Sequence, residues 1–436
     1  MTYKEARVYL DKVSKYGSVL GLDTIQNLLN ELGNPQDQLK FIHIAGTNGK
    51  GSTLSFISSI LQEAGYRTGR YTSPAVLTYL EMIQVDGEMI SEVDFARLVE
   101  KVKNAIARME TKGLNSPTIF EVETAIAFLY FYEKDCDYVV LETGLGGIED
   151  ATNVVKNTVA AVFSTISCDH MGILGNDIKE IAEKKAGIIK AGCKIISASQ
   201  EPEVQCVLQK YAERVGCSIT FAQPEKAVIK KSDHLGSRFS YKDQTEWEIK
   251  LAGSYQIINA VTAIEFAQSG VVSGISVEAI REGLKKTEWV GRFTCISEEP
   301  LFIIDGAHNE DAAKRLRETV ELYFPEQKKT FICGVFKDKE YDKIAKLMAP
   351  LADKIYTINL PNQERTFDAE CLKEVMKSYC TEACVVEAVG MEYGVESQIE
   401  RAVEKALEEA DENTVILAFG SLSYLGRIVK YMRESL

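Results

Sequence analysis

From residue 43 to residue 52 the chain reads HIAGTNGKGS, a loop that carries three glycines and one lysine. An apolar run at residues 41–45 leads into this loop, and a pattern typical of a helix follows it at residues 53–61. A strand, a glycine-rich loop and a helix in this order bind nucleotide phosphates. The glycines let backbone N–H groups point at the anion, while the helix N-terminus and Lys50 supply positive charge. The stretch therefore predicts a phosphate-binding loop within an α/β fold.

The spacing of this loop departs from the strict Walker pattern, which requires glycine where this chain has Ile44. A glycine-rich surface turn is the alternative, but such a turn needs neither the strand nor the helix that flank this one. No G-x-G-x-x-G spacing occurs, which favours a mononucleotide triphosphate over a dinucleotide. The candidate nucleotide-binding residues of the loop are Asn48, Gly49, Lys50, Gly51 and Ser52, and Lys50 is also a candidate catalytic residue.

The composition of the 436-residue chain, 45% hydrophobic and 26% charged, is that of a globular protein. The length predicts two or three domains. The formal net charge is −14. Since no block of basic residues offsets the acidic surface, we expect neither nucleic acid nor a membrane surface as a partner.

Ten cysteines are scattered along the chain without a C-x-x-C pair. Reduced thiols in a cytoplasmic protein are therefore expected rather than a disulfide framework. The four histidines do not cluster with cysteines, which argues against zinc. The first residues lack the apolar core of a secretion signal, and no apolar stretch has the length of a membrane span.

Helices are expected within residues 1–35, and from residue 38 to about residue 220 strands and helices alternate. The expected strands are 40–45, 138–143, 158–166, 194–198 and 218–221, and the expected helices are 51–64, 93–109, 121–133, 177–189 and 203–215. This alternation predicts a P-loop-type, doubly wound and mostly parallel sheet with helices on both faces. Residues 226–251 alternate polar and apolar side chains around a turn at 241–244, which predicts an appended β-hairpin.

A second series of strands and helices begins near residue 301 and predicts a smaller, Rossmann-like α/β domain. Its expected strands are 301–304, 330–335, 354–358 and 414–418, and its expected helices are 310–322, 342–351, 369–378 and 397–409. We therefore expect an N-terminal nucleotide-binding domain at residues 1–295 and a C-terminal domain at residues 296–436.

Polar residues follow several expected strands, where ligands bind in doubly wound folds. Glu142 ends a buried strand before a glycine turn and is a candidate Mg²⁺ ligand; a carboxylate exposed on the loop is the alternative. His170 follows another strand end, and a metal ligand or a structural histidine fits it equally. Asp305 and His308 follow the first strand of the second domain. Arg292, just upstream, could bind a phosphate through two hydrogen bonds, or it could be a solvated hinge residue.

Taken together, these motifs resemble the folylpolyglutamate synthase/dihydrofolate synthase family of the Mur ligase superfamily over nearly the whole chain. The motifs that carry the resemblance are GTNGKGS at 46–52, TSP at 72–74, FE at 120–121, ETGLGGIEDATN at 142–153, DH at 169–170, EKKAGIIK at 183–190, Gln256 with NA at 259–260, GR at 291–292, DGAHN at 305–309 and GSL at 420–422. Gly51 is the most family-specific feature, because other Mur-type ligases usually carry threonine directly after the lysine.

The resemblance implies a site for ATP and two Mg²⁺ ions. The loop at 46–52 would cradle the phosphates, and the further residues expected to contact ATP are Asn259, Arg292, Asp305 and His308. The family's metal ligands fall on Ser73, Glu142 and His170, with Glu142 shared between the two ions. Lys185 matches a lysine that is carbamylated in the family, and a carbamate supplies an anionic oxygen where an ammonium would repel Mg²⁺. The implied catalytic residues are Lys50, Glu142, His170 and Lys185.

Two further segments match those that contact the pterin substrate in the family. Their residues are Thr118, Ile119, Phe120 and Glu121 in the first and Glu149, Asp150 and Ala151 in the second. The chain departs from the family pattern at Ala75, Ile148, Tyr255, Val290 and Glu310. Ile148 replaces the arginine of the usual GLGGR loop, and this lost charge predicts altered substrate preference or affinity.

The resemblance implies ATP-dependent addition of L-glutamate to folates, and to dihydropteroate as well, through an acyl phosphate, by a monomeric cytoplasmic enzyme that acts on small molecules. Two alternatives stay open. A different Mur-type ligase would use another acceptor, although such enzymes usually carry a larger N-terminal domain. A non-catalytic ATP-binding descendant would account for the departures at Ala75, Ile148 and Tyr255. It would, however, have no use for Glu142, His170 and Lys185.

Overall fold

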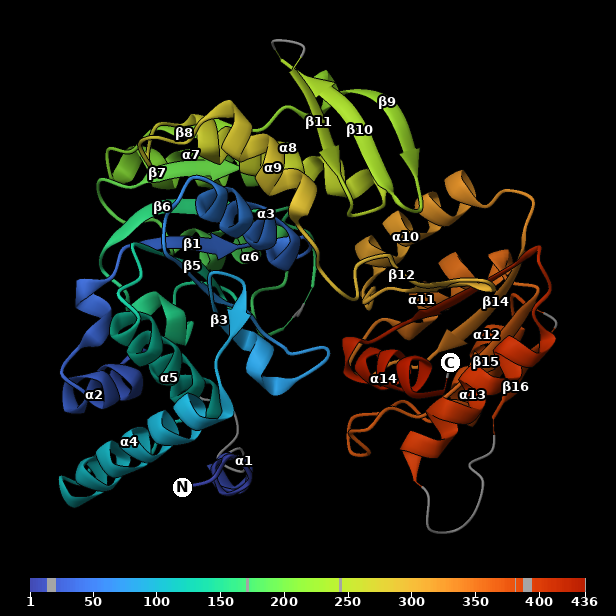
Figure 1. The fold of residues 1–436 in the computed structure, drawn as a ribbon, viewed down its shortest axis with the longest axis horizontal. Helices are drawn as coiled ribbons and strands as arrows, with labels where there is room; N and C mark the ends of the chain where they lie inside the picture. The colour runs from blue at the N-terminus through green and yellow to red at the C-terminus, as the bar shows by residue number, and fades with distance from the viewer. Residues whose placement is uncertain (14–20, 170–171, 243–244, 381, 387–393, 436) are drawn as a thin grey trace. The chain divides into compact units, whose positions relative to one another are not determined.

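The computed structural model describes residues 1–13, 21–169, 172–242, 245–380, 382–386 and 394–435 (Figure 1). Contacts between residues divide the chain into two compact units. The first unit comprises Met1–Ser73, Leu80–Ala227 and Ile258–Thr287, and the second comprises Pro74–Tyr79, Val228–Ile257 and Glu288–Leu436. Each unit is built from separate stretches of sequence, and the expected domain boundary between residues 295 and 296 stays a prediction.

The first unit is built around a mostly parallel sheet in the order β4-β3-β2-β5-β1-β6-β7-β8. Its strands are β1 (Phe41–Ala45), β2 (Thr68–Tyr71), β3 (Ile83–Val85), β4 (Glu88–Met89), β5 (Tyr138–Glu142), β6 (Thr158–Phe163), β7 (Lys194–Ser197) and β8 (Ile219–Phe221). The pairings of β3 with β2 and with β4 are antiparallel, and the other described pairings in this sheet are parallel. Its helices are α1 (Tyr3–Val13), α2 (Asp23–Glu31), α3 (Lys50–Glu63), α4 (Glu92–Thr111), α5 (Ile119–Glu133), α6 (Ile178–Ala186), α7 (Pro202–Arg214), the larger part of α8 (Ser254–Gln268) and α9 (Val277–Lys286).

Helices cover both faces of this sheet, as the alternation of strands and helices predicts. On one face the ring of Phe41 packs edge-on against Phe128 of α5, with the ring centroids 5.4 Å apart. Apolar side chains of α6 and α7 join the same face in one buried cluster with residues of β6 and β7. On the other face α3 covers the sheet, and Arg70 of β2 donates a hydrogen bond to Ser55 of α3. The sheet is therefore buried on both sides, which explains why every residue of β1 is buried.

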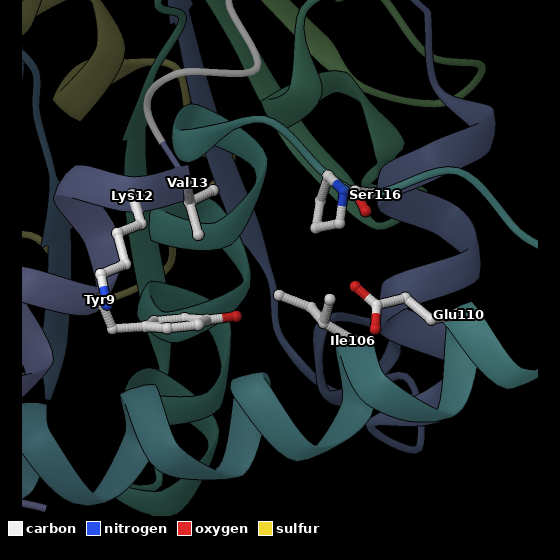
Figure 2. A pocket seen from close by; sticks show the side chains of 7 residues that line it. Tyr9, Lys12, Val13, Ile106, Glu110 and Ser116 are labelled. Atoms are coloured by element: carbon white, nitrogen blue, oxygen red, sulfur yellow. The ribbon is translucent and has the colours of Figure 1, made fainter.

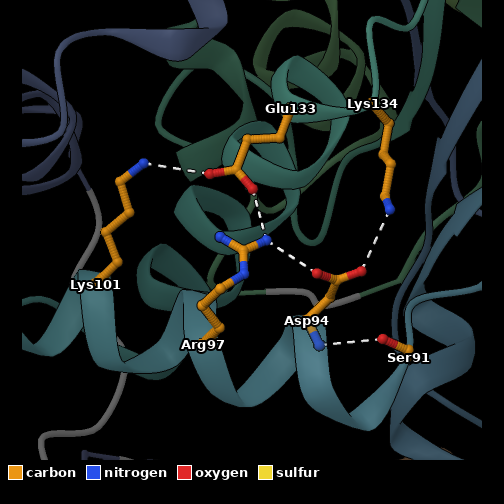
Figure 3. A network of polar contacts seen from close by, with 6 residues as sticks. All are labelled: Ser91, Asp94, Arg97, Lys101, Glu133 and Lys134. Carbon is orange, nitrogen blue, oxygen red and sulfur yellow. Dashed lines mark hydrogen bonds and ion pairs between the residues drawn. The ribbon is translucent and has the colours of Figure 1, made fainter.

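A network of ion pairs joins α4 to the adjacent α5 (Figure 3). Arg97 donates hydrogen bonds to Asp94 at 3.0 Å and to Glu133 at 2.7 Å. Lys101 pairs with Glu133 and Lys134 pairs with Asp94, both at 3.3 Å. Burial opposes the ionisation of Glu133, but the hydrogen bonds from Arg97 and Lys101 outweigh it and lower the pKa of Glu133.

The second unit is built around a sheet in the order β12-β13-β17-β14-β15-β16, in which only β12 is antiparallel to its neighbour. Its strands are β12 (Thr294–Glu298), β13 (Leu301–Ile304), β14 (Lys328–Cys333), β15 (Lys354–Thr357), β16 (Ala383–Val385) and β17 (Thr414–Phe419). Its helices are α10 (Glu310–Tyr323), α11 (Tyr341–Met348), α12 (Ala369–Lys377), α13 (Val395–Glu409) and α14 (Leu425–Ser435). One buried cluster packs α10, α11 and α12 on one face, and another packs α13 and α14 on the opposite face. This arrangement confirms the expected Rossmann-like fold.

The expected hairpin at residues 226–251 is wrong in one respect, because the described residues there form three antiparallel strands. These strands are β9 (Val228–Asp233), β10 (Gly236–Tyr241) and β11 (Thr245–Ile249), with β10 in the middle. The additional turn is held by Asp233, whose carboxylate accepts a hydrogen bond from the Leu235 amide at 2.9 Å. Alternation did not reveal β9 because Val228 and Ile229 are neighbours in sequence and both are exposed.

Short strands account for most of the other differences from expectation. The expected strands did not include β2, β3, β4, β12 or β16, each of which has two to five residues. The expected strand at 158–166 ends at Phe163, since Ser164 and Thr165 turn to contact the glycine-rich loop. No helix in the described part of the chain is both long and apolar enough to cross a bilayer.

Candidate functional site

The strand order of the first unit brings four chain segments to one edge of its sheet. Strands β2, β5, β1 and β6 are neighbours and parallel, so their carboxyl ends lie at the same edge. Ser73 follows β2, Glu142 ends β5, the glycine-rich loop follows β1, and the segment with Asp169 follows β6. Ligands bind at this edge in open α/β sheets.

The loop at 46–52 has the tight backbone that a phosphate cradle requires. Gly49 begins α3 with φ of 84°, a conformation that favours glycine. A Cβ atom on Gly49 would collide with the side-chain oxygen of Asn259, and one on Gly46 would collide with the hydroxyl of Ser164. Asn259, expected to contact ATP, therefore lies directly beside the loop, and its side chain also accepts a hydrogen bond from Thr53 at 3.4 Å.

Residues that follow β6 hold this loop in place. The amides of Thr47 and Asn48 donate to the carbonyl of Thr165 at 2.8 and 3.2 Å. The Thr47 hydroxyl donates to the Ser167 carbonyl at 2.9 Å and accepts from the Ser167 amide at 3.0 Å. Sequence reasoning did not single out Thr47, Thr165 or Ser167, and the polar run 164–167 at the end of an apolar segment was the only available signal.

Lys50 and Glu142 face each other at this edge. The Lys50 ammonium lies 4.0 Å from a carboxylate oxygen of Glu142 and 3.3 Å from the carbonyl of Thr47. Only 7% of the Glu142 side chain is exposed, so the alternative of a carboxylate exposed on a loop is wrong. The hydroxyl of Ser52 is buried and has no hydrogen-bond partner among the residues that the structure describes. An unpartnered hydroxyl in the first turn of α3, near an acidic residue, suits a metal ion bound to phosphate.

Lys185 reaches this site from α6. Its ammonium donates a hydrogen bond to the carbonyl of Gly46 at 2.8 Å, and only 4% of the residue is exposed. Burial and the nearby charge of Lys50 lower the pKa of Lys185 to about 7, although Asp169 and Asp150 oppose the shift. At neutral pH a substantial fraction of this amine is therefore unprotonated and nucleophilic.

Arg70 is a partly buried charge near the site that sequence reasoning missed. It lies on β2 and donates hydrogen bonds to Gln84 at 2.6 Å and to Ser55 at 3.3 Å. Burial lowers the pKa of Arg70 to about 10, while the charges of Glu81 and Glu142 oppose the shift. The guanidinium is therefore a cation whose charge interacts with that of Glu142.

The loop after β5 contains the second expected substrate segment. Glu149 forms an ion pair with Lys184 at 2.9 Å, and Ala151 is buried. The Asp150 carboxylate accepts a hydrogen bond from the Leu145 amide at 2.7 Å, which closes the loop on itself. Ile148, at 39% exposure, presents an apolar side chain where the family pattern has arginine.

The first expected substrate segment begins α5. Thr118 and Glu121 form a reciprocal capping box, in which the Glu121 carboxylate accepts from the Thr118 amide at 2.7 Å. Glu121 is buried and therefore serves the helix end, whereas Ile119 is partly exposed. Phe120 packs so closely over Gly144 that a Cβ atom there would overlap its ring. The first expected substrate segment therefore contacts, through Phe120, the loop after β5 that leads to the second.

Asp305 is the centre of a polar cluster in the second unit. Its carboxylate accepts hydrogen bonds from the amides of Phe293 and Ala307 at 2.7 and 2.8 Å and from the Tyr255 hydroxyl at 3.2 Å. Burial raises the pKa of Asp305, although the charge of Arg292 and these hydrogen bonds oppose the shift. Tyr255, one of the departures from the family pattern, is thus a direct partner of Asp305.

Arg292 and His308 lie beside this cluster. The Arg292 guanidinium donates to the Gly291 carbonyl at 3.0 Å. A Cβ atom on Gly306 would collide with the same guanidinium, so the backbone between Asp305 and His308 passes directly against Arg292. A ring nitrogen of His308 lies 2.7 Å from the Gly306 carbonyl. The structure therefore brings Arg292, Asp305 and His308 together within the second unit, as it brings the loop, Glu142, Lys185 and Asn259 together within the first.

The structure describes some, but not all, of the residues expected to hold Mg²⁺. His170 lies outside the described residues, and Ser73 is placed only by its position after β2. Across the residues that the structure describes, no three His, Cys, Asp or Glu side chains are grouped to hold a metal ion. Glu142, the unpartnered Ser52 hydroxyl and Lys185 are the groups that fit one, provided that Lys185 carries a carbamate.

A separate small cavity of about 130 Å³ lies between α1, α4 and the segment that leads into α5 (Figure 2). Its lining residues are Tyr9, Lys12, Val13, Ile106, Glu110, Ser116 and Pro117. No expected site residue lines it. It is smaller than the pockets of about 300–1,000 Å³ that hold small-molecule ligands.

Two protein-family models match most of the chain. Residues 44–267 match the Mur ligase middle domain, and residues 291–422 match the Mur ligase, glutamate ligase domain. Dihydrofolate synthase/folylpolyglutamate synthase of Bacillus subtilis is 39% identical over 364 residues, which cover 81% of this chain and 84% of that protein. Folylpolyglutamate synthase of Lacticaseibacillus casei is 33% identical over 374 residues, which cover 84% and 87% of the two chains.

Solved structures agree along the full length. Folylpolyglutamate synthase of Thermotoga maritima matches with a TM-score of 0.84 at 31% identity, covering 100% of this chain and 97% of that one. FolC of E. coli, solved with DHPP and ADP, matches with a TM-score of 0.85 at 27% identity, covering 100% and 98%. With two matching domains and relatives of this identity and coverage, the chain belongs to the folylpolyglutamate synthase/dihydrofolate synthase family of Mur ligases.

Proposed function

We propose that the protein is an ATP-dependent ligase that forms an amide between L-glutamate and a folate, and also between L-glutamate and dihydropteroate. Membership of the family supports the ligase activity, and its relatives are named for both acceptors. The single observation that carries the proposal is the glycine-rich loop. Its own Lys50 pairs with Glu142 of β5, and Lys185 of α6 donates a hydrogen bond to its Gly46 carbonyl.

The reaction joins a carboxylate and an amine, and a free carboxylate is a poor acyl donor because its leaving group would be oxide. The acceptor carboxylate attacks the γ-phosphorus of ATP, a carboxylate oxygen–phosphorus bond forms, and ADP leaves. The amine of L-glutamate then attacks the acyl carbon, loses a proton and expels inorganic phosphate. Phosphoryl transfer of this kind depends on positioning and on neutralisation of phosphate charge.

The loop supplies both of these contributions. Its glycines expose backbone N–H groups at the start of α3, where the helix dipole favours an anion. Lys50 is held 3.3 Å from the Thr47 carbonyl, so its charge stays over the loop. In the bound state we expect the ammonium to leave Glu142 for the phosphates, since the 4.0 Å ion pair is at the limit of contact.

Two Mg²⁺ ions would be held by Ser73, Glu142, His170 and carbamylated Lys185, and when bound they would neutralise the phosphate oxygens and orient ATP. Carbamylation requires a neutral amine: Nζ of Lys185 attacks carbon dioxide, an N–C bond forms and one proton is released. The burial of Lys185 and its pKa of about 7 support this step. The unpartnered Ser52 hydroxyl supports a metal at the first turn of α3.

In the second unit we infer that Arg292, Asp305 and His308 contact ATP, and in the first unit that Asn259 does so. The pterin would lie against the segments that include Phe120 and Asp150, and Phe120 contacts Gly144 in the loop that leads to Asp150. We further propose that the protein is a cytoplasmic monomer and that its C-terminal domain, residues 296–436, binds L-glutamate.

The test is mass spectrometry of products formed with MgATP and L-glutamate. Dihydropteroate is the acceptor in one reaction and tetrahydrofolate in another. Dihydrofolate from the first and a glutamate-extended folate from the second establish both activities. Product from only one reaction assigns a single activity, and restoring the family residue with Ile148→Arg then tests whether position 148 is the cause. No product from either, with ADP still bound, overturns the proposal.

A further inference from the structure

A buried histidine lies beneath the nucleotide loop, on the strand that leads into it. His43 is the middle residue of β1, and none of its surface is exposed. Its ring nitrogen Nε2 lies 2.8 Å from the hydroxyl of Thr152, a residue 109 positions later in the chain. Nδ1 of the same ring is buried, and no described residue forms a hydrogen bond with it.

The partners of Thr152 determine which atom donates in this contact. The Thr152 hydroxyl also contacts a carboxylate oxygen of Asp150, and that oxygen accepts a further bond from the Thr152 amide at 3.0 Å. A carboxylate can only accept, so the single hydroxyl proton of Thr152 points to Asp150. The Thr152 oxygen is then left as an acceptor, and His43 must donate to it from Nε2.

This assignment agrees with the surroundings of the ring. Burial and the charge of Lys190 lower the pKa of His43 to about 3, so the imidazole is neutral at physiological pH and carries one proton. That proton sits on Nε2, and Nδ1 is the nitrogen without a partner. The chain of donors therefore runs in one direction, from His43 through Thr152 to Asp150.

Asp150 also forms a hydrogen bond with the backbone of the loop that contains the second expected substrate segment. Its second carboxylate oxygen accepts from the Leu145 amide at 2.7 Å, which closes residues 145–150 into a ring. The loop is then anchored to α6, because the Ile148 amide donates to the Lys184 carbonyl at 2.9 Å. Asn153 adds a bond to the Gly187 carbonyl at 3.2 Å.

We propose that His43 is a positioning residue for the acceptor substrate: through Thr152 it fixes the Asp150 carboxylate and the loop at 144–151 relative to the nucleotide strand. The inference rests on the proposed function, in which the segment 149–151 contacts the pterin. Because the donor chain ends at the acceptor side of the site, its loss acts on acceptor binding. The nucleotide loop keeps its own anchors at Thr165 and Ser167.

The experiment compares three variants in the ligase assay with dihydropteroate or tetrahydrofolate. His43→Leu removes the Nε2 donor at similar volume, His43→Gln retains an N–H donor near that position, and Thr152→Val breaks the chain at its middle. We expect His43→Leu and Thr152→Val to raise the KM for the acceptor about tenfold and to leave the KM for ATP within about twofold. We expect His43→Gln to restore the acceptor KM to within about threefold of the unchanged protein.

Two results would overturn the inference. One is an acceptor KM that stays unchanged in His43→Leu and Thr152→Val while both fold normally by circular dichroism and thermal melting. The other is a His43→Gln variant no better than His43→Leu, since that would show that ring volume and not donation matters. The unchanged protein is assayed alongside, so absence of any product there counts against the proposed function and not against the role of His43.

Discussion

Gly49 shows at the scale of one residue why the loop tolerates only glycine at the start of α3. Its φ is 84°, and the space where a Cβ atom would lie is occupied by the side chain of Asn259. Gly65, at the other end of the same helix, has almost the same φ of 85° but open space around it. Comparing the two glycines therefore separates the cost of a positive φ from the cost of a clash with a neighbouring side chain.

For this reason we expect Gly65→Ala to lower the free energy of unfolding by about 1 kcal/mol, from backbone strain alone. Gly49→Ala should lower it by about 2–3 kcal/mol, since strain and the contact with Asn259 act together, and should also weaken ADP binding. Urea unfolding and calorimetric titration with ADP measure both effects. Equal losses in the free energy of unfolding of the two variants would show that the Asn259 side chain moves aside without an energetic penalty.

Lys50 provides the mobile charge of the loop, and its removal separates chemistry from folding. We expect Lys50→Ala to reduce ATP turnover by about 10³-fold or more, because phosphate charge is no longer neutralised. The fold should persist, since the side chain is partly exposed and makes one contact to the Thr47 carbonyl and one to Glu142. Lys194→Ala, on an exposed lysine at the start of β7, is the matched control. Full ATP turnover in Lys50→Ala would show that the loop does not take part in the reaction in the way proposed.

His43 makes folding stability depend on pH in a predictable direction. An unfolded histidine has a pKa near 6.5, whereas native His43 has a pKa of about 3, so between these values the unfolded chain binds more protons. The contribution of His43 to the free energy of unfolding is therefore fully present above about pH 6.5 and is lost as the pH falls towards 3. By about pH 5 the loss from this one group is about 2 kcal/mol.

The His43→Gln variant removes the titrating group and should reduce this loss. The free energy of unfolding in urea, measured at about pH 5 and about pH 7.5, gives the pH dependence for both proteins. An identical pH dependence in the two proteins would mean that the native ring takes up a proton as readily as the unfolded one.

At the scale of elements, α4 and α5 are joined by the ion-pair network centred on Arg97 (Figure 3). The side chains are partly exposed, 48% for Arg97 and 26% for Glu133, so solvent and salt screen the attraction. We expect Arg97→Ala to lower the free energy of unfolding by only about 0.5–1 kcal/mol in low salt and by less at about 1 M NaCl. Ligase activity should not change. A loss that persists undiminished in high salt would indicate packing of the Arg97 stem rather than charge.

At the scale of the whole molecule, the residues expected to contact ATP are divided between the two units. The loop at 46–52 and Asn259 belong to the first, and Arg292, Asp305 and His308 belong to the second. If both sets bind the same nucleotide, an ATP analogue must protect both from hydrogen exchange.

We therefore expect AMPPCP with Mg²⁺, at about 100 times its Kd, to slow amide exchange in peptides that cover 46–52 and in peptides that cover 291–309. Exchange of individual peptides is the suitable measurement because a chain of two units need not unfold in one step. If amide exchange slows only in peptides of the first unit, the proposed roles of Arg292, Asp305 and His308 in ATP binding are wrong.

The extent of prediction from sequence differs between the sheet and the site. Apolar runs at β1, β5 and β6 and the helical periodicity after them are local patterns, so the parallel sheet was predicted with small errors at the ends. The two-residue β4 and the short edge strands carry no such pattern, and they form because neighbouring strands offer free hydrogen-bonding groups.

By itself the sequence determined the glycine-rich loop, the alternation of strands and helices, and the acidic residue at the end of β5, since each is written in consecutive residues. Only the tertiary structure decided what surrounds them. Lys185 meets Gly46 across 139 positions, and His43 meets Thr152 across 109. Such contacts depend on which strands become neighbours and on burial, which shifts the pKa of Lys185 and of His43 in ways that no local pattern encodes.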